Sequence, residues 1–457
     1  MKPAPEQKRT DYTEGSILGA ILKMGLPSMF GFLSQSIYTF ADTFWVARLP
    51  QNEAGVAAVT FFGNILWVVF SFNNLVGPGS VAVISRRYGE KDFDAAAGAI
   101  KESLLLKLVF GAVFGLAGWR FAEPMLRLVG AEGEALAMGV AYGRIMFLGV
   151  PVMYATYTIF TAMRGVANPN MAMILMLGSN LLNIGLDPVL MFGWFGLPAM
   201  GIRGAAVASV GSFALTLLVG LGLFYGGAAN VRLTLRGQTR VGLTTMWRIV
   251  RIGIPSLFGE LSFSGSRLVI TPLVAIFGTA VVAAYGVGLQ VFGFGISMLV
   301  GIGLGLSSLI GHTVGSGKTQ RARITGDRSV LLGMAVLTLY GAIVFVFAGP
   351  IMRLFFDAPE TVGHGITLLR IFALSFPVFG AYEMLVQIHS GVGLNTPAMV
   401  VSMVHGWFLQ VLPILLLVKV LALPQEAIWW TLAGSGVLSA GAMYWYYRKG
   451  KWLTVQI

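Results

Sequence analysis

The sequence predicts an all-α integral membrane protein with twelve transmembrane helices, arranged as two pseudo-symmetric six-helix lobes around a central cleft. Its composition, a series of long apolar runs and an internal repeat support this. Of the 457 residues, 56% are hydrophobic and 11% are charged, and the mean hydropathy is +0.79. Soluble proteins carry about 25% charged residues. Lipid is therefore the main solvent of this chain.

The apolar runs are long and continuous. Runs of about 20 residues cross roughly 30 Å of hydrocarbon as helices, whereas barrel strands are shorter and alternate in polarity. Helices also satisfy every backbone amide within lipid. The predicted spans are 16–42, 54–79, 97–119, 136–160, 170–193, 204–225, 249–272, 280–309, 329–350, 364–389, 397–421 and 427–447.

Lysine and arginine gather in segments that alternate along the chain. These segments are the N-terminus (Lys2, Lys8, Arg9), 80–101, 226–251, 312–328 and the C-terminus. The intervening connections hold fewer basic residues and also carry acids. The positive-inside rule then places both termini in the cytoplasm and requires an even number of spans. We expect a multi-pass protein of a cytoplasmic (inner) membrane.

An internal repeat divides the chain. Residues 21–37 (ILKMGLPSMFGFLSQSI) align with residues 249–265 (IVRIGIPSLFGELSFSG), and Gly25 matches Gly253. Since six spans separate the copies, both insert with the same orientation, which is a parallel repeat with a substrate site between the copies. The expected division is an N-lobe (1–225), a polar, basic cytoplasmic linker (226–248) and a C-lobe (249–457).

Three polar side chains stand out in the N-lobe spans. A carboxylate such as Asp42 is costly within the membrane unless it is paired, protonated or bound to an ion. Asn183 and Asp187 are four residues apart and share one helix face. Such oxygen ligands either bind a hard cation such as Na⁺ or share one proton between like charges. The alternatives are an interfacial position for Asp42 and a helix–helix hydrogen bond for Asn183.

The C-lobe has a second polar group, formed by Glu260, Arg267 and Glu383. We weigh a coupling or substrate site against simple satisfaction of buried polar groups, including an intrahelical pair between Glu260 and Arg267. His389 and His405 lack the spacing and cysteine partners of a zinc site. No metal is expected beyond a possible Na⁺ at the N-lobe residues.

Four prolines lie inside predicted spans: Pro27, Pro151, Pro255 and Pro377. Proline frees a backbone carbonyl and bends a helix. These residues are therefore predicted either as hinges for alternating access or as packing kinks.

Several functional classes are disfavoured. The basic residues are confined to loops and termini, so nucleic acid is not an expected partner. The chain has no cysteine, which excludes disulfides and thiolate metal sites. No loop carries a carboxylate pair, an HExxH motif or a Ser/His arrangement of catalytic spacing, so we expect no enzyme and no cofactor. No filter-like repeat indicates a channel.

The repeat and three motifs resemble the MATE (multidrug and toxic compound extrusion) family, in its DinF-like prokaryotic branch. The motifs are TEGSILGAILKMGLPSMFGFLSQSIYTFADTFWVARL, LGSNLLNIGLDPVL and GIRGAAVAS. The resemblance covers nearly the whole chain. It implies secondary efflux of amphipathic organic cations in exchange for inward H⁺ or Na⁺, across a bacterial or archaeal membrane. It also implies a cation or proton site at Asp42, Asn183, Asp187 and Ser209, where threonine is usual at the last position.

The resemblance leaves two questions open. Some family branches place functional acids in helices seven and ten, where Glu260 and Glu383 fall, but Arg267 has no counterpart there. The superfamily also contains flippases of lipid-linked oligosaccharides, typically with several cavity arginines, so a flippase of an amphipathic precursor is the alternative function. The expected partners are cationic amphipathic small molecules and membrane lipids, and the expected state is a monomer.

Overall fold

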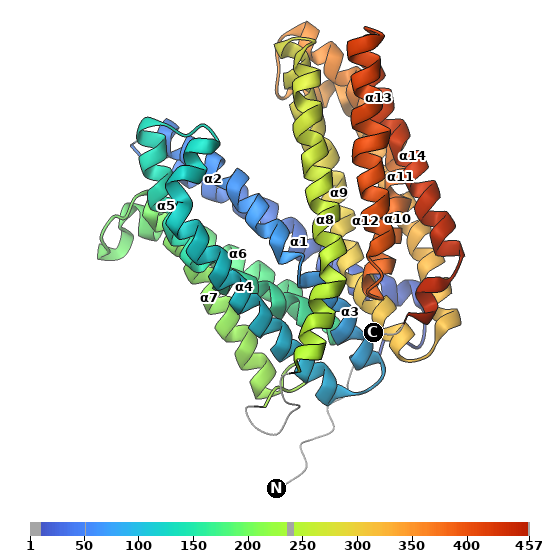
Figure 1. The fold of residues 1–457 in the computed structure, drawn as a ribbon. Coiled ribbons are helices and arrows are strands. Elements are labelled where there is room, and N and C mark those ends of the chain that lie inside the picture. Colours follow the sequence, from blue (N-terminus) through green and yellow to red (C-terminus); the bar gives the residue numbers. More distant parts are fainter. Residues whose placement is uncertain (1–10, 51, 235–241, 456–457) are drawn as a thin grey trace.

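The computed structural model describes residues 11–50, 52–234 and 242–455. Its helices form two bundles that meet at one end and diverge at the other, like the arms of a V (Figure 1). The first and last described segments of the chain both lie at the end where the bundles meet. The predicted all-helical, two-lobed fold is confirmed.

The first bundle is the N-lobe, and it contains six spans. Its helices are α1 (Ile17–Val46), α2 (Asn52–Asn73), α3 (Gly77–Gly89), α4 (Phe93–Leu128), α5 (Gly133–Gly165), α6 (Pro169–Phe192) and α7 (Ile202–Gly226). The predicted span 54–79 is not one helix, because α2 ends at Asn73 and α3 begins at Gly77. The carbonyl oxygen of Asn73 at this break accepts a hydrogen bond from Lys107 Nζ at 2.8 Å, which gives this mid-span cation a structural role.

The C-lobe repeats this arrangement. Its first helices are α8 (Leu243–Ala275), α9 (Thr279–Gly315), α10 (Thr319–Arg353) and α11 (Pro359–Gly391). The eleventh span combines α12 (Thr396–Met403), the π-helical η2 (Val404–Val411), α13 (Leu412–Leu415) and the π-helical η3 (Leu416–Val420), and α14 (Glu426–Arg448) is the twelfth.

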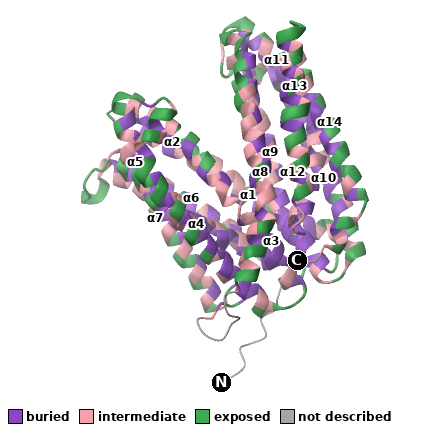
Figure 2. Cartoon of the chain, viewed as in Figure 1, coloured by how far each residue is buried: buried purple, intermediate pink, exposed green. Residues whose placement is uncertain are grey.

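Ten of these spans are long and apolar enough to cross a membrane by composition alone within the described ranges. The other two, α8 and α14, carry polar or aromatic-rich stretches, including Glu260 and Arg267 in α8. Large apolar side chains are exposed along the outside of the bundles, as on α10, where Leu331, Leu339 and Val346 are each more than 60% exposed. Figure 2 places buried residues between the helices and exposed ones on the periphery. This pattern suits a protein surrounded by lipid.

The first helix of each repeat packs into the opposite lobe. A Cβ at Gly25 of α1 would lie 3.0 Å from Ile302 of α9, and a Cβ at Gly253 of α8 would lie 1.9 Å from the carbonyl oxygen of Leu75. These two glycines are equivalent in the repeat. Their lack of a side chain lets the two helices cross the boundary between the lobes at close range.

The chain ends also connect the lobes. Residues 12–15, just before α1, are bonded to the start of α10: Lys318 Nζ donates to Thr13 Oγ1 at 3.0 Å, and Arg321 donates to the carbonyl of Gly15 at 2.9 Å. At the other end, Arg86 of α3 donates to the carbonyl of Val455. We call residues 12–15 with Lys318 and Arg321 the N-terminal strap.

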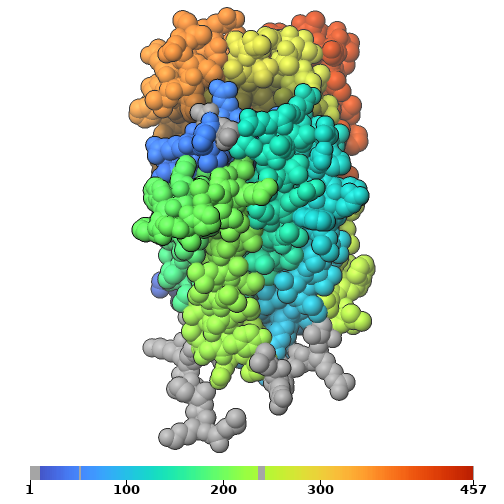
Figure 3. All heavy atoms as spheres, turned by 90° about the vertical axis from the view of Figure 1, so that its left-hand side faces the viewer, coloured from blue at the N-terminus to red at the C-terminus, as the bar shows by residue number. Residues whose placement is uncertain are grey.

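The connection between the lobes is shorter than the sequence indicates. Helix α7 ends at Gly226, and α8 begins at Leu243 rather than at 249, because polar residues outside the hydrocarbon still continue a helix. The central part of the expected linker, 235–241, and the basic residues Lys2, Lys8 and Arg9 lie outside the described residues. Figure 3 faces the N-lobe, and the C-lobe is visible behind it, extending above its upper end.

Candidate functional site

The predicted N-lobe residues come from three helices and converge inside that lobe. Asp42 lies in α1, Asn183 and Asp187 lie in α6, and Ser209 lies in α7. All four side chains are buried, and Asp187 is 0% exposed. The structure thus brings the four residues into one neighbourhood, with the two carboxylates close enough for their charges to interact.

A chain of hydrogen bonds links three of these residues. With its amide nitrogen facing Asp187, Asn183 donates to Asp187 Oδ2 at 3.2 Å and accepts from the backbone nitrogen of Ser209 at 3.1 Å. Its oxygen also accepts from Ser209 Oγ at 3.2 Å. Asn183 therefore fixes the position of Asp187 relative to α7.

Asp42 has no such support. Its Oδ1 is buried and has no hydrogen-bond partner within the described part of the chain. An unpaired carboxylate in a low-dielectric site is costly unless a proton or a cation neutralises it. The arrangement is therefore chemically suited to binding one positive charge, supplied by H⁺ or Na⁺.

Tyr38 extends the network and was not predicted from the sequence as a site residue. Its hydroxyl lies 3.1 Å from Ser209 Oγ. Because the Ser209 hydroxyl donates to Asn183, Tyr38 is the donor in this contact. The available signal was spacing, since Tyr38 is four residues before Asp42 and shares its helix face.

The three C-lobe residues are close enough for the charge of Glu260 to interact with those of Arg267 and Glu383, but no hydrogen bond or ion pair joins the three side chains to one another. Glu383 accepts a hydrogen bond from Gln387 at 2.9 Å, and Gln387 in turn accepts from Ser307 at 2.9 Å. Glu260 and Arg267 do not come within ion-pair distance of each other, since the ion pairs of the described residues do not include them. Glu383 is thus satisfied by neighbouring groups, whereas Arg267 projects into a pocket of the C-lobe.

The four prolines all lie inside helices: Pro27 in α1, Pro151 in α5, Pro255 in α8 and Pro377 in α11. At Pro151 the close neighbour is glycine, because a Cβ at Gly111 of α4 would lie 2.5 Å from the proline Cα. That contact gives Pro151 a packing role between α4 and α5. Over the described ranges, no group of three or more His, Cys, Asp or Glu residues is placed to hold a metal ion.

Comparison with known sequences identifies the family. The MatE family model matches residues 27–189 and 255–416, one segment in each lobe. The chain belongs to the MatE family. It is a membrane transporter of that family, and the match covers both copies of the internal repeat, as the sequence predicts.

Named relatives share low identity over almost the full length. The chain is 25% identical to the probable multidrug resistance protein YoeA of Bacillus subtilis, over 93% of this chain and 92% of the relative. It is 26% identical to the multidrug export protein MepA of Staphylococcus haemolyticus, over 97% of this chain and 96% of the relative.

Solved structures share the fold over a similarly large part of the chain. A MOP superfamily transporter from Pyrococcus furiosus superposes with a TM-score of 0.88 at 23% identity, covering 98% of this chain and 100% of that one. An outward-facing multidrug resistance MATE family transporter gives a TM-score of 0.89 at 23% identity with the same coverage. Both structures share the fold of this chain over almost its full length.

Proposed function

We propose that this MatE transporter exports amphipathic organic cations in exchange for inward H⁺ or Na⁺. The observation that carries the proposal is the buried Asp42 carboxylate, which has an unpartnered oxygen beside the Asn183–Asp187 network. A transported H⁺ or Na⁺ neutralises this site, and its release leaves the charge uncompensated. The named multidrug export relatives support the choice of cargo.

The orientation follows from charge. Arg86 bonds to Val455 near the last described residues, and Lys318 bonds to Thr13 near the first, so both cations lie at the end where the bundles meet. The positive-inside rule places that end in the cytoplasm of a bacterial or archaeal cell. The V then opens outward, so the ion enters from outside and the bound drug leaves to the same side.

Exchange requires that the ion and the drug favour different states of the protein. Neutralising Asp42 and Asp187 removes the repulsion between them and lets α1 and α6 approach. The same neutralisation removes the negative charge that attracts a cationic drug. Pro27 and Pro255 lie in the two helices that cross between the lobes, where a bend changes the contact of each helix with the opposite lobe.

The test is transport in liposomes of defined orientation. Efflux of ethidium is followed under separately imposed H⁺ and Na⁺ gradients, for the wild type and for Asp42→Asn and Asp187→Asn. Glu123→Gln is the matched control, since Glu123 lies in an exposed pair with Arg127. We expect one gradient to drive efflux, and we expect both Asp variants, but not the control, to lose it. Absence of cation transport by the wild type under either gradient would overturn the proposal in favour of a lipid-linked cargo.

A further inference from the structure

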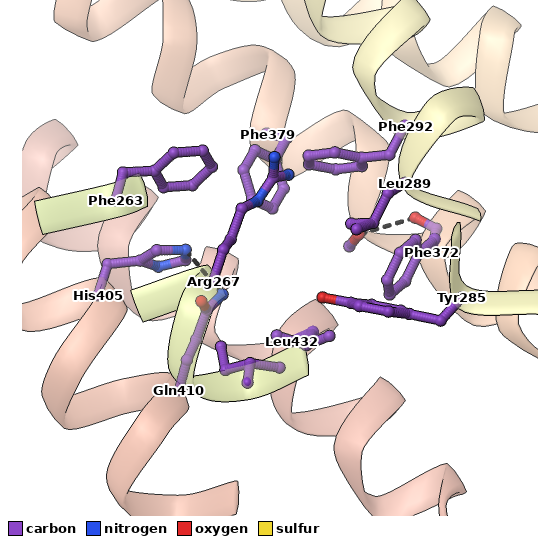
Figure 4. A pocket seen from close by; sticks show the side chains of 12 residues that line it. Phe263, Arg267, Tyr285, Leu289, Phe292, Phe372, Phe379, His405, Gln410 and Leu432 are labelled. Carbon is purple, nitrogen blue, oxygen red and sulfur yellow. Dashed lines mark hydrogen bonds between the residues drawn. The ribbon is translucent and has the colours of Figure 1, made fainter. Parts of the chain in front are cut away.

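A pocket inside the C-lobe has a chemistry opposite to that of the N-lobe site. Residues of α8, α9, α11, η2 and α14 line it, and they include Arg267, Tyr285, His405 and Gln410 (Figure 4). None of the lining residues is an aspartate or a glutamate. Arginine is the permanently charged group in this lining.

Arg267 and Tyr285 supply donors that have no acceptor. The Arg267 guanidinium donates no hydrogen bond to any residue the structure describes. It lies over the Phe263 ring, 4.7 Å from the centroid, and close to Phe292 and Phe379 in Figure 4. The Tyr285 ring stacks on Trp429, which fixes its direction, and its hydroxyl points into the same pocket. That hydroxyl has no partner among the described residues either.

The hydrogen-bond donors of His405 and Gln410 in the pocket are already used. Ser439 Oγ donates to the carbonyl of Ser435 at 3.0 Å, so His405 Nδ1 donates to Ser439 Oγ at 2.8 Å. His405 Nε2 then accepts from Gln410 at 2.9 Å. This leaves His405 neutral and without a free donor.

The π-helical turn η2 makes this arrangement possible. Its wider turn brings His405 and Gln410, which are five residues apart, close enough for their side chains to bond to each other. Gln410 also donates to Ser435 of α14 at 3.0 Å. The π turn therefore locks one side of the pocket; Arg267 lies beside it, and the Tyr285 hydroxyl points toward it from across the pocket (Figure 4).

We propose that this pocket binds the anionic group of an amphipathic molecule, such as a carboxylate or a phosphate. A guanidinium held among aromatic rings lacks the hydration that it has in water, and an oxyanion supplies both the missing charge and the missing acceptors. Tyr285 adds a second, neutral donor. The cavity is small, about 40 Å³, which suits a head group and leaves an apolar tail outside the pocket.

Glu260 is the nearest acid on the same helix, but it does not line the pocket. It lies seven residues before Arg267 and makes no ion pair with it. The charge of Glu260 interacts with that of Arg267 from beyond ion-pair distance, so an anionic ligand displaces no direct hydrogen bond or ion pair of Arg267.

Binding measurements test this without any ion gradient, so the result is independent of the proposed antiport. The purified protein in phosphatidylcholine nanodiscs is titrated with a dansyl-labelled undecanoate and with its uncharged methyl ester. We expect the wild type to bind the carboxylate about tenfold more tightly than the ester, as a charged hydrogen bond of about 1.5 kcal/mol implies. Arg267→Gln should abolish this preference, Arg267→Lys should keep part of it, and Tyr285→Phe should reduce it.

The ester is an internal control for folding, since its affinity should not change in a folded Arg267→Gln protein. Arg370→Gln is the matched variant, because Arg370 also lies over a phenylalanine ring of the C-lobe but is outside the pocket. Equal affinity of the wild type for acid and ester, or an unchanged preference in Arg267→Gln, overturns the proposal.

Nanodiscs of different lipid composition distinguish a lipid head group from a free solute as the source of the anion. In nanodiscs that contain phosphatidylglycerol, a lipid head group that occupies the pocket would weaken undecanoate binding to the wild type and leave Arg267→Gln unaffected. No effect of phosphatidylglycerol assigns the pocket to a free solute.

Discussion

Gly89 of α3 and Gly315 of α9 each lie against the backbone of the other's helix. A Cβ at Gly89 would lie 2.2 Å from the carbonyl oxygen of His312, and a Cβ at Gly315 would lie 2.3 Å from the carbonyl oxygen of Arg86. Arg86 comes three residues before Gly89, and His312 comes three residues before Gly315, so the contact is reciprocal. The crossing joins the two lobes where they meet.

The crossing should tolerate no added side chain. Gly89→Ala or Gly315→Ala forces the two backbones apart, with an expected loss of about 1–3 kcal/mol in the free energy of unfolding. The measurement is thermal unfolding in detergent. Gly286→Ala is the control, because Gly286 is in the same helix as Gly315 and a Cβ there would meet no atom within 4 Å; a similar loss there would show a general effect of alanine in α9.

The N-lobe network predicts a non-additive pair of substitutions. Ser209→Ala removes the hydroxyl that joins Tyr38 to Asn183, so Tyr38→Phe should cost little more in that background. Each single change should weaken the apparent affinity for the driving ion, with a coupling of about 1 kcal/mol between them. Ser209→Thr keeps the hydroxyl and should retain affinity. Additive losses in a double-mutant cycle of ion-driven efflux would contradict the network.

The N-terminal strap should loosen when its two cations are removed. Lys318→Ala combined with Arg321→Ala deletes exposed contacts worth about 0.2–1 kcal/mol each. A loss of this size should make amide hydrogen exchange in residues 12–15 several times faster. Exchange in the helices should be unaffected. Arg353→Ala, at the opposite end of α10, is the control and should leave this segment unchanged.

Asp11 predicts how the same segment responds to acid. Partial burial opposes its charge, but hydrogen bonds from Thr13 and the charges of Lys318 and Lys91 outweigh this and lower the pKa of Asp11. A lowered pKa means that the contact with the Thr13 amide, 2.8 Å long, is present above the ordinary pKa of aspartate and is lost as pH falls through the lowered value. The protection factor of the Thr13 amide should stay constant near neutral pH and decrease only in strong acid. Asp11→Asn should show no such transition.

Much of the fold could be predicted from the sequence, because membrane spans depend on apolar length and the lobes on a repeat such as Gly25 with Gly253. The break between α2 and α3 was harder to predict. Its glycines and proline lie within an apolar run, and the group that stabilises the break, Lys107, comes from another helix. The π turns of the eleventh span leave no periodic signal in the sequence.

The candidate site was predictable only in part. Asp42 and Asp187 are costly in lipid and stand out in any sequence, whereas Tyr38 is one aromatic among many until the structure places it beside Ser209. In the C-lobe, the sequence alone could not show whether Glu260 and Arg267 form an ion pair or have separate roles. That choice depends on the direction of the Arg267 side chain, which the rings of α8, α9 and α11 set.

The crossing of α3 and α9 also has a mechanical meaning. Helix α9 has 37 residues and ends at Gly315, so at about 1.5 Å per residue it is a lever roughly 55 Å long with its fulcrum at one end. A tilt of about 10° at that fulcrum displaces the far tip of such a rod by roughly 10 Å. Because the glycine contact lies at one end of α9, a small change in the angle of the helix there would move its other end, at the open side of the V, by a much larger distance.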